Sequence, residues 1–262
     1  MENGVRTFGA GAFPPGVLLA AKGDRAVSIC IPARDEGATV GAVVAAVRQT
    51  HVAAAGGSGL VDEVVVVDDG SADGTGGAAR AAGATVVALP RGQGKGSAMR
   101  AGLAAATGDV LVYLDADVEN TTGAFVAQLL GPLLTATGVA LVKGYYERPL
   151  AGAPSGGGRV TELMARPAIE VLFPELAAVH QPLAGETAAP RWVLEALDFE
   201  PGYGVELGLL VDVARKFGVG AVAQTDLGVR VHRNRPLDEL RPQAVEVLRA
   251  ALARSGPGTP SR

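Results

Sequence analysis

Two carboxylates one residue apart, Asp115 and Asp117, directly follow the apolar run Val110–Leu114. A continuous apolar run is typical of a buried strand in a parallel sheet, and ligands of open α/β sheets bind at the carboxyl ends of such strands. Carboxylate oxygens at that position can share a divalent cation such as Mg²⁺ with the diphosphate of a substrate. A solvated acidic turn is the alternative reading, and this D-x-D pair alone does not distinguish the two.

Two further polar segments follow predicted strands. The run Ile31-Pro-Ala-Arg-Asp-Glu-Gly37 comes first, and Glu36 there suits the positive end of the next helix. The run Val67-Asp-Asp-Gly-Ser-Ala-Asp-Gly-Thr75 comes second, although helix capping by Ser71 and Asp73 would also explain it. Each signal is weak when taken alone, and each has a purely structural alternative.

A glycine-rich segment, Arg91-Gly-Gln-Gly-Lys-Gly-Ser97, precedes the third predicted helix. Its glycines allow close approach of a ligand, and Lys95 beside a helix N-terminus favours an anion. The spacing does not match the phosphate-binding loop G-x-x-x-x-G-K-[ST]. Taken in chain order, these segments and the D-x-D pair predict a notch for a nucleobase, a cation for phosphate and a metal-binding carboxylate.

The elements that would position these residues alternate along the chain. We expect strands over 26–31, 63–67, 86–89 and 110–114, separated by helices over 37–49, 74–82 and 97–106. Beyond residue 118 we expect helices over 125–134, 160–172, 202–217 and 237–253, strands over 140–146, 221–223 and 228–231, and a loop over 173–190. Strands alternating with helices predict an α/β fold with a mainly parallel central sheet flanked by helices.

Composition narrows the class of protein. A hydrophobic fraction of 48% with 19% charged residues is typical of a soluble globular protein, and the net charge of −4 argues against a nucleic-acid partner. The single cysteine, Cys30, excludes an internal disulfide and lies in an apolar run, so a buried thiol is expected. We see no signal peptide and no apolar run long enough for a membrane helix. The sequence therefore predicts a cytoplasmic protein without a membrane partner.

The ordered segments "IPARDE", "VVDDGSADGT", "GKGSAMRAGLAAATGD" and "YLDAD" resemble the N-terminal half of GT-A nucleotide-sugar transferases. The G-x-G-x-x-G of dinucleotide-binding proteins is absent after the first strand, which disfavours an NAD enzyme. Four later segments resemble the retaining glucosyl/mannosyl-3-phosphoglycerate synthase family: 156–163, 181–186, 202–206 and 231–237. The resemblance covers roughly residues 25–245. The chain departs from the family in its N-terminus, which looks short for the family, and in the middle residue of the D-x-D, which is Ala116 where Ser would also be expected.

The chain divides into an arm, a domain and a tail. Residues 1–24 are rich in glycine and proline and are expected to form an irregular arm, and the resemblance implies a single GT-A catalytic domain over 25–236. Within it, 25–118 would bind the nucleotide sugar and 119–236 the acceptor, followed by a C-terminal helix and disordered tail over 237–262.

The resemblance also implies roles for individual residues. Asp117 and His232 would bind the metal, which would be Mg²⁺, Mn²⁺ or Co²⁺, and Glu206, Asp117 and Arg235 would be the catalytic residues. The donor would contact Pro32, Ala33, Arg34, Glu36, Ser71, Lys95, Asp115, Ala116, Leu183, Ala184, Gly185 and Tyr203. A lone histidine is rarely a ligand, but His232 follows a short predicted strand in a chain with an unpaired D-x-D.

The acceptor would contact Gly158, Arg159, Val160, Thr161, Asn234 and Arg235. The residues themselves agree with this role, because a helix start with a guanidinium and a hydroxyl suits a dianion. A plain loop joined to a helix is the alternative for the segment 158–161.

The implied reaction moves glucose from UDP-glucose or GDP-glucose to the 2-hydroxyl of D-3-phosphoglycerate with retention, in a homodimeric enzyme. Three alternatives stay open: mannosyl transfer from GDP-mannose, inverting transfer to a polyprenyl phosphate, and a non-catalytic nucleotide-sugar sensor. A polyprenyl phosphate acceptor would call for a membrane-facing apolar helix, which the sequence lacks.

Overall fold

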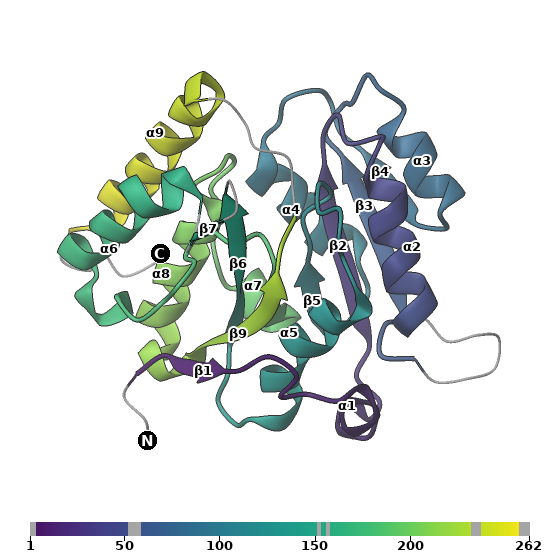
Figure 1. Cartoon of the computed structure of the whole chain (residues 1–262), viewed down its shortest axis with the longest axis horizontal. Coiled ribbons are helices and arrows are strands. Elements are labelled where there is room, and N and C mark those ends of the chain that lie inside the picture. The colour runs from purple at the N-terminus through teal and green to yellow at the C-terminus, as the bar shows by residue number, and fades with distance from the viewer. Residues whose placement is uncertain (1–3, 52–58, 151–152, 156–157, 232–236, 257–262) are drawn as a thin grey trace.

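The computed structural model describes residues 4–51, 59–150, 153–155, 158–231 and 237–256 (Figure 1). These residues form one mostly parallel sheet in the order β1-β9-β6-β8-β5-β2-β3-β4, with β7 paired to β6. The strands are β1 (Arg6–Phe8), β2 (Val27–Ala33), β3 (Glu63–Asp68), β4 (Thr85–Ala88), β5 (Val110–Tyr113), β6 (Leu141–Leu150), β7 (Ala153–Ser155), β8 (Thr187–Pro190) and β9 (Val222–Val229). The expected α/β class with a mainly parallel sheet is confirmed.

Helices cover both faces of this sheet (Figure 1). They are α1 (Pro15–Lys22), α2 (Val40–His51), α3 (Thr75–Ala81), α4 (Lys95–Ala105), α5 (Gly123–Thr135), η1 (Thr161–Ala165), α6 (Arg166–Leu172), η2 (Pro174–Leu176), α7 (Arg191–Glu195), α8 (Val205–Phe217), η3 (Val219–Ala221) and α9 (Leu237–Arg254). Helices α1, α2 and α5 pack in one apolar layer, and α4, α6, α8 and α9 pack in the other.

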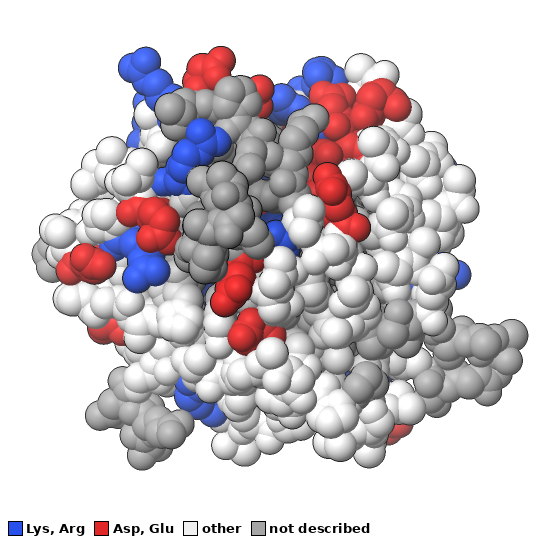
Figure 2. All heavy atoms as spheres, viewed as in Figure 1, with Lys and Arg blue, Asp and Glu red and all other residues white. Residues whose placement is uncertain are grey.

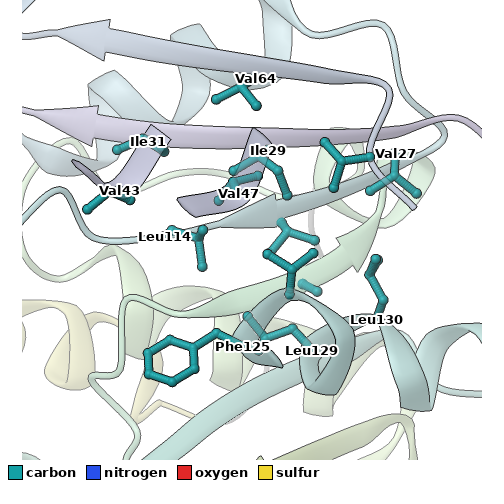
Figure 3. Packing of buried hydrophobic residues seen from close by; sticks show 14 of the residues in the cluster. Val27, Ile29, Ile31, Val43, Val47, Val64, Leu114, Phe125, Leu129 and Leu130 are labelled. Atoms are coloured by element: carbon teal, nitrogen blue, oxygen red, sulfur yellow. The ribbon is translucent and has the colours of Figure 1, made fainter. Parts of the chain in front are cut away.

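Strand β2 shows why the sequence is mostly apolar there. Ile29 and Ile31 point into the layer that contains Val43 of α2 (Figure 3), whereas Cys30 points into the layer that contains Met99 of α4. Because both faces of the strand are covered, most of its side chains are apolar, and each buried aliphatic side chain contributes about 1.5–3 kcal/mol. The exception is the buried Ser28, whose hydroxyl donates to Oε1 of Glu63 at 2.6 Å. The expected buried thiol is confirmed, and burial raises the pKa of Cys30 to about 12.

The order of strands places a switch point beside β2. The chain runs from β2 through β3 to β4 at one edge of the sheet, and then returns to β5 on the other side of β2. Strands β3 and β5 both pair with β2 in parallel register. The loops that follow β2 and β5 therefore lead away in opposite directions at the carboxyl ends of these two strands. Open α/β sheets bind their ligands at such a position.

The N-terminal arm, expected to be irregular, contains an edge strand and a helix. Strand β1 pairs in parallel with β9, and α1 packs on α5. Phe13 lies against Gly131 so closely that a Cβ there would be 2.0 Å from the Phe13 ring. The prediction was wrong because a three-residue strand has no readable periodicity, and its stability comes from pairing with a strand distant in sequence.

The second half contains two further differences from the expected elements. Strand β8 lies within the segment predicted as a loop and pairs antiparallel with β5 and β6. Its sequence, Thr-Ala-Ala-Pro, lacks the β-branched run that indicates a strand. The strands predicted over 221–223 and 228–231 belong to one strand, β9. The prediction divided it because the buried polar residues Gln224 and Thr225 interrupt its apolar pattern.

The π-helical turn η1 and helix α6 together replace the single helix predicted over 160–172. Helix α9 begins and ends close to the expected boundaries. The predicted disorder of the final residues falls mostly on 257–262, outside the described residues. None of the helices in the described part of the chain is both long and apolar enough to cross a membrane.

Candidate active site

The D-x-D pair lies where β5 ends, at the carboxyl edge of the sheet. The four residues of β5 are buried, and β5 lies between β2 and β8. Asp115 and Asp117 follow the strand with side chains only 17% and 22% exposed. Acidic and basic side chains both gather over the upper part of the face in Figure 2, the end toward which β6 points in Figure 1. A solvated acidic turn is therefore excluded, because both carboxylates are largely buried.

Lys95 links Asp115 to the predicted catalytic carboxylate, Glu206. Its Nζ lies 2.7 Å from Oδ1 of Asp115 and 2.6 Å from Oε1 of Glu206. Burial alone would lower the pKa of Lys95, but the two carboxylates raise it well above its ordinary value. Lys95 therefore stays protonated and presents a fixed positive charge beside the D-x-D.

Arg230 joins the two aspartates from the other side, and the sequence did not single it out. Its Nη2 lies 2.8 Å from Oδ2 of Asp115 and 3.2 Å from Oδ1 of Asp117. Burial would raise the pKa of Asp115, but Lys95 and Arg230 hold it well below its usual range. A signal was present, since Arg230 is a charged residue in the short strand predicted over 228–231 and comes just before the segment 231–237.

The back of the Arg230 guanidinium is held by two buried groups. Its Nη1 donates to the hydroxyl oxygen of Tyr146 at 2.5 Å and lies 3.3 Å from Oε2 of Glu186. Its Cζ also lies 5.0 Å from the centre of the Tyr146 ring. Burial raises the pKa of Glu186, whose Oε1 is buried without a hydrogen-bond partner in the described chain. One nitrogen of Arg230 thus faces the protein interior and the other faces the D-x-D.

Close packing of glycines brings Lys95 and Glu206 together. A Cβ at Gly96 would lie 1.7 Å from the carbonyl oxygen of Glu200, and the Ser97 amide donates to the Pro201 carbonyl at 2.9 Å. The start of α4 therefore contacts the loop that leads into α8, where Glu206 lies in the first turn and is 4% exposed. Glu206 is therefore not a solvated residue on the surface of the helix.

The remaining part of that loop contacts α9. The Tyr203 amide donates to Oε2 of Glu246 at 2.6 Å, so α9 fixes the loop that precedes Glu206. The predicted contact of Tyr203 with the donor sugar stays a prediction.

The segments after β2 and β3, where a nucleobase notch is predicted, contact each other directly. Asp35, with the left-handed φ of 54°, donates its amide to Oγ of Ser71 at 2.9 Å. Its carboxylate accepts the Ala72 amide and pairs with Arg91 at 2.8 Å, and both contacts lower its pKa. Asp69 accepts the amides of the glycine-rich segment at Gln93 and Gly94.

These contacts bring together the loops that carry several of the predicted donor residues: Pro32, Ala33, Arg34, Glu36, Ser71 and Lys95. Arg34 is half exposed, and its Nη1 lies 3.7 Å from Oδ2 of Asp69.

The predicted sugar-facing turn, Leu183–Gly185, packs directly on the D-x-D. A Cβ at Gly185 would lie 2.0 Å from Oδ1 of Asp115, so only glycine fits. Ala184 is buried and its carbonyl accepts a hydrogen bond from Lys143. The turn therefore reaches the same centre as Lys95, Arg230 and Glu206.

The predicted acceptor segment begins a helix, as expected. The Glu162 amide donates to the Gly158 carbonyl at 2.9 Å, Arg159 is exposed and Thr161 is buried. The remaining predicted residues, His232, Asn234 and Arg235, lie outside the described residues. Roles for all of these residues stay predictions.

The donor set at Asp117 suits a hard divalent cation. Within the described residues Asp117 uses Oδ1 for Arg230, and its Oδ2 has no hydrogen-bond partner. Oxygen ligands of this kind are preferred by Mg²⁺ and Mn²⁺. No cluster of three His, Cys, Asp or Glu ligands occurs in the described ranges.

Comparisons with known proteins agree with this geometry. Residues 28–151 match the family model described as glycosyl transferase family 2. The chain is 48% identical over 250 residues to a glucosyl-3-phosphoglycerate synthase of Mycolicibacterium smegmatis, covering 91% of this chain and 80% of that relative. The corresponding relative from Mycobacterium tuberculosis is 46% identical over 255 residues, covering 92% of this chain and 77% of its own length.

Solved structures show the same fold. The Mycobacterium tuberculosis glucosyl-3-phosphoglycerate synthase in complex with Mn²⁺, UDP-glucose and phosphoglyceric acid superposes with a TM-score of 0.88 at 44% identity. The alignment covers 98% of this chain and 89% of that one. The expected GT-A fold is confirmed.

Proposed function

The chain belongs to the glucosyl-3-phosphoglycerate synthase family, and we propose that it transfers glucose from UDP-glucose to the 2-hydroxyl of D-3-phosphoglycerate. The observation that carries the proposal is the buried chain of ion pairs Glu206–Lys95–Asp115–Arg230–Asp117 at the switch point of the sheet. Relatives of known structure hold UDP-glucose and phosphoglyceric acid, which supports this donor and this acceptor.

Asp117, with His232, would hold the divalent cation. When bound, that cation supplies a Lewis acid that neutralises the leaving diphosphate. Lys95 and Arg230 pair with the D-x-D as permanently charged groups, which favours an anionic leaving group without any change of protonation.

Glu206 would position the donor sugar. Its carboxylate is already paired with Lys95 at 2.6 Å, and this pairing lowers its power as a nucleophile. We therefore favour attack of the acceptor on the same face from which the diphosphate leaves, with retention of configuration. Trapping of a covalent glucosyl adduct on Glu206 would contradict this mechanism.

The acceptor would be held by the helix start at Gly158–Thr161 together with Asn234 and Arg235. Amides of the first helical turn, the Thr161 hydroxyl and the Arg159 guanidinium suit the phosphate and carboxylate of 3-phosphoglycerate. Holding the acceptor by its charged groups would place its hydroxyl against the anomeric carbon, and such positioning contributes several kcal/mol to catalysis.

A homodimer is part of the proposal. Helix α9 exposes Val245, Leu248 and Leu252, and the neighbouring Leu163 is 78% exposed. Apolar side chains gathered on adjacent elements favour a protein contact. The cytoplasmic location expected from the sequence stays a prediction.

A matrix of donors and acceptors tests the proposed reaction. UDP-glucose, GDP-glucose and GDP-mannose are each incubated with and without D-3-phosphoglycerate, and with Mg²⁺, Mn²⁺ or a chelator. We expect nucleotide release and glucosyl-3-phosphoglycerate only where UDP-glucose, acceptor and metal are all present. If GDP-mannose is the only donor that supports transfer to 3-phosphoglycerate, the protein is a mannosyl transferase. If a nucleotide sugar binds but no nucleotide is released under any condition, the protein is a sensor.

A further inference from the structure

Lys143 is a buried lysine that none of the roles above uses. It lies on β6, is 1% exposed, and forms no ion pair with a carboxylate of the described chain. Its Nζ donates to the carbonyl oxygen of Ala184 at 2.5 Å and to Oγ1 of Thr187 at 3.0 Å. Burying an ammonium group costs several kcal/mol, so this position requires an explanation.

Lys143 and Gly144 on β6 donate hydrogen bonds to the segment around the Leu183–Gly185 turn, which packs on the D-x-D. Lys143 holds the turn at Ala184, and the Gly144 amide holds it one step later by donating to the Glu186 carbonyl at 2.8 Å. Between these two contacts Gly185 packs on Asp115 so closely that the carboxylate leaves no room for a Cβ atom on residue 185. The position of the turn relative to Asp115 therefore depends directly on β6.

The turn does not need Lys143 for its hydrogen bonds. The Thr187 hydroxyl already lies 3.3 Å from the Ala184 carbonyl, so these two groups would pair with each other in the absence of the lysine. Burial lowers the pKa of Lys143 to about 8, which means that its charge is unfavourable in the folded protein. A residue retained only for stability would be apolar here, because buried ionic groups are often replaced by apolar ones without loss.

We propose that Lys143 is a positioning residue for glucosyl transfer, which seats the Leu183–Gly185 turn on Asp115 in the geometry that receives the donor. The proposal rests on the proposed function of the D-x-D site. The charged groups that face Lys143 are Glu206 on α8, Lys95 on α4, Glu186 before β8 and Asp115 after β5. Its positive charge therefore also offsets the carboxylates that surround the donor.

The Lys143→Met variant tests the proposal, since methionine keeps the length of the side chain. We expect kcat/KM for UDP-glucose to fall roughly 10- to 100-fold, the range that a hydrogen bond from a charged group supplies. We expect KM for 3-phosphoglycerate to stay unchanged and Tm to stay unchanged or rise. As the pH rises through about 8, the ratio of wild-type to variant kcat/KM should narrow, because the wild-type lysine then loses its charge.

Lys22→Met is the matched control. Lys22 is also buried, and its Nζ donates to the Gly59 carbonyl at 2.8 Å and to Asp62 at 2.7 Å, beside the amino ends of β2 and β3. Since it pairs with a carboxylate away from the D-x-D, its loss should lower Tm and leave both KM values unchanged.

Thr187→Val serves as a milder second variant, because it removes one acceptor of Lys143 and should lower kcat/KM for the donor less than Lys143→Met does.

Binding of UDP-glucose in the presence of Mn²⁺, measured by calorimetry, separates this proposal from the proposed reaction. Wild-type kinetics and binding in Lys143→Met, or an activity loss that only follows a lower Tm, would overturn the positioning role. If the wild type binds UDP-glucose but transfers nothing to 3-phosphoglycerate, the proposed reaction fails, and weaker donor binding by the variant still supports Lys143. Absence of donor binding by the wild type would overturn both.

Discussion

Gly185 lies so close to Asp115 that a Cβ on residue 185 would be 2.0 Å from the Asp115 Oδ1 atom. This contact joins the turn before β8 to the loop after β5, two segments that the sequence separates by about seventy residues. The same aspartate is paired with Lys95 and Arg230. A shift of the turn would therefore move Asp115, the carboxylate that pairs with both Lys95 and Arg230.

Gly185→Ala should lower kcat/KM for UDP-glucose at least about tenfold, because the added methyl group must displace Asp115 or the turn, and overpacking of this kind costs about 1–3 kcal/mol. Steady-state kinetics and thermal denaturation measure the two effects. Gly77→Ala on α3 is the control, since a Cβ there meets nothing within 4 Å and alanine is the better helix former. Unchanged donor kinetics in Gly185→Ala would show that the contact does not matter for catalysis.

Arg230→Lys should weaken donor binding although it keeps the charge. The guanidinium contacts the D-x-D through Nη2 and Tyr146 through Nη1, and one ammonium group cannot replace both nitrogens. We expect kcat/KM for the donor to fall roughly 10- to 100-fold, with a matching loss of UDP affinity in calorimetric titrations with Mn²⁺. Arg254→Lys is the control, since Arg254 pairs with Asp212 at 2.7 Å between α8 and α9 and should affect stability alone.

Asp117→Asn should raise the concentration of Mn²⁺ or Mg²⁺ required for half-maximal transfer at least roughly 10-fold, because a carboxylate ligand is lost. Removal of the metal with a chelator should abolish transfer by the wild type, and added metal should restore it. Asp109→Asn is the control, since this aspartate lies just before the other end of β5 and accepts the Ala26 amide. An unchanged metal requirement in Asp117→Asn would remove it from the metal site.

The stability of the protein should rise with pH between about 8 and about 10.5 through Lys143. Its folded pKa of about 8 lies below the ordinary 10.5, so the unfolded chain binds more protons in this window and the free energy of unfolding increases with pH. The full effect of the shift is about 3 kcal/mol. Urea denaturation of the wild type and Lys143→Met at several pH values measures it, and parallel curves for the two proteins would contradict the assignment.

The sequence by itself determined the fold class and one half of the site. Apolar runs such as Val110–Leu114, covered on both faces, must form buried parallel strands, and polar residues at their carboxyl ends must meet at one edge of the sheet. Asp115, Asp117 and Lys95 could therefore be placed from local pattern and chain order alone. Residues such as Glu206 were placed by resemblance, and the structure brings Glu206 to the same centre.

Only the tertiary structure decided which buried charges surround these residues. Arg230, Glu186 and Lys143 lie on or beside strands β9, β8 and β6, whose adjacency follows from pairing between distant segments. Short strands such as β8 and β1 carry no periodicity that would reveal their partners. A buried charge is stable only through its neighbours in space, and those neighbours come from the folded sheet rather than from the order of residues in the chain.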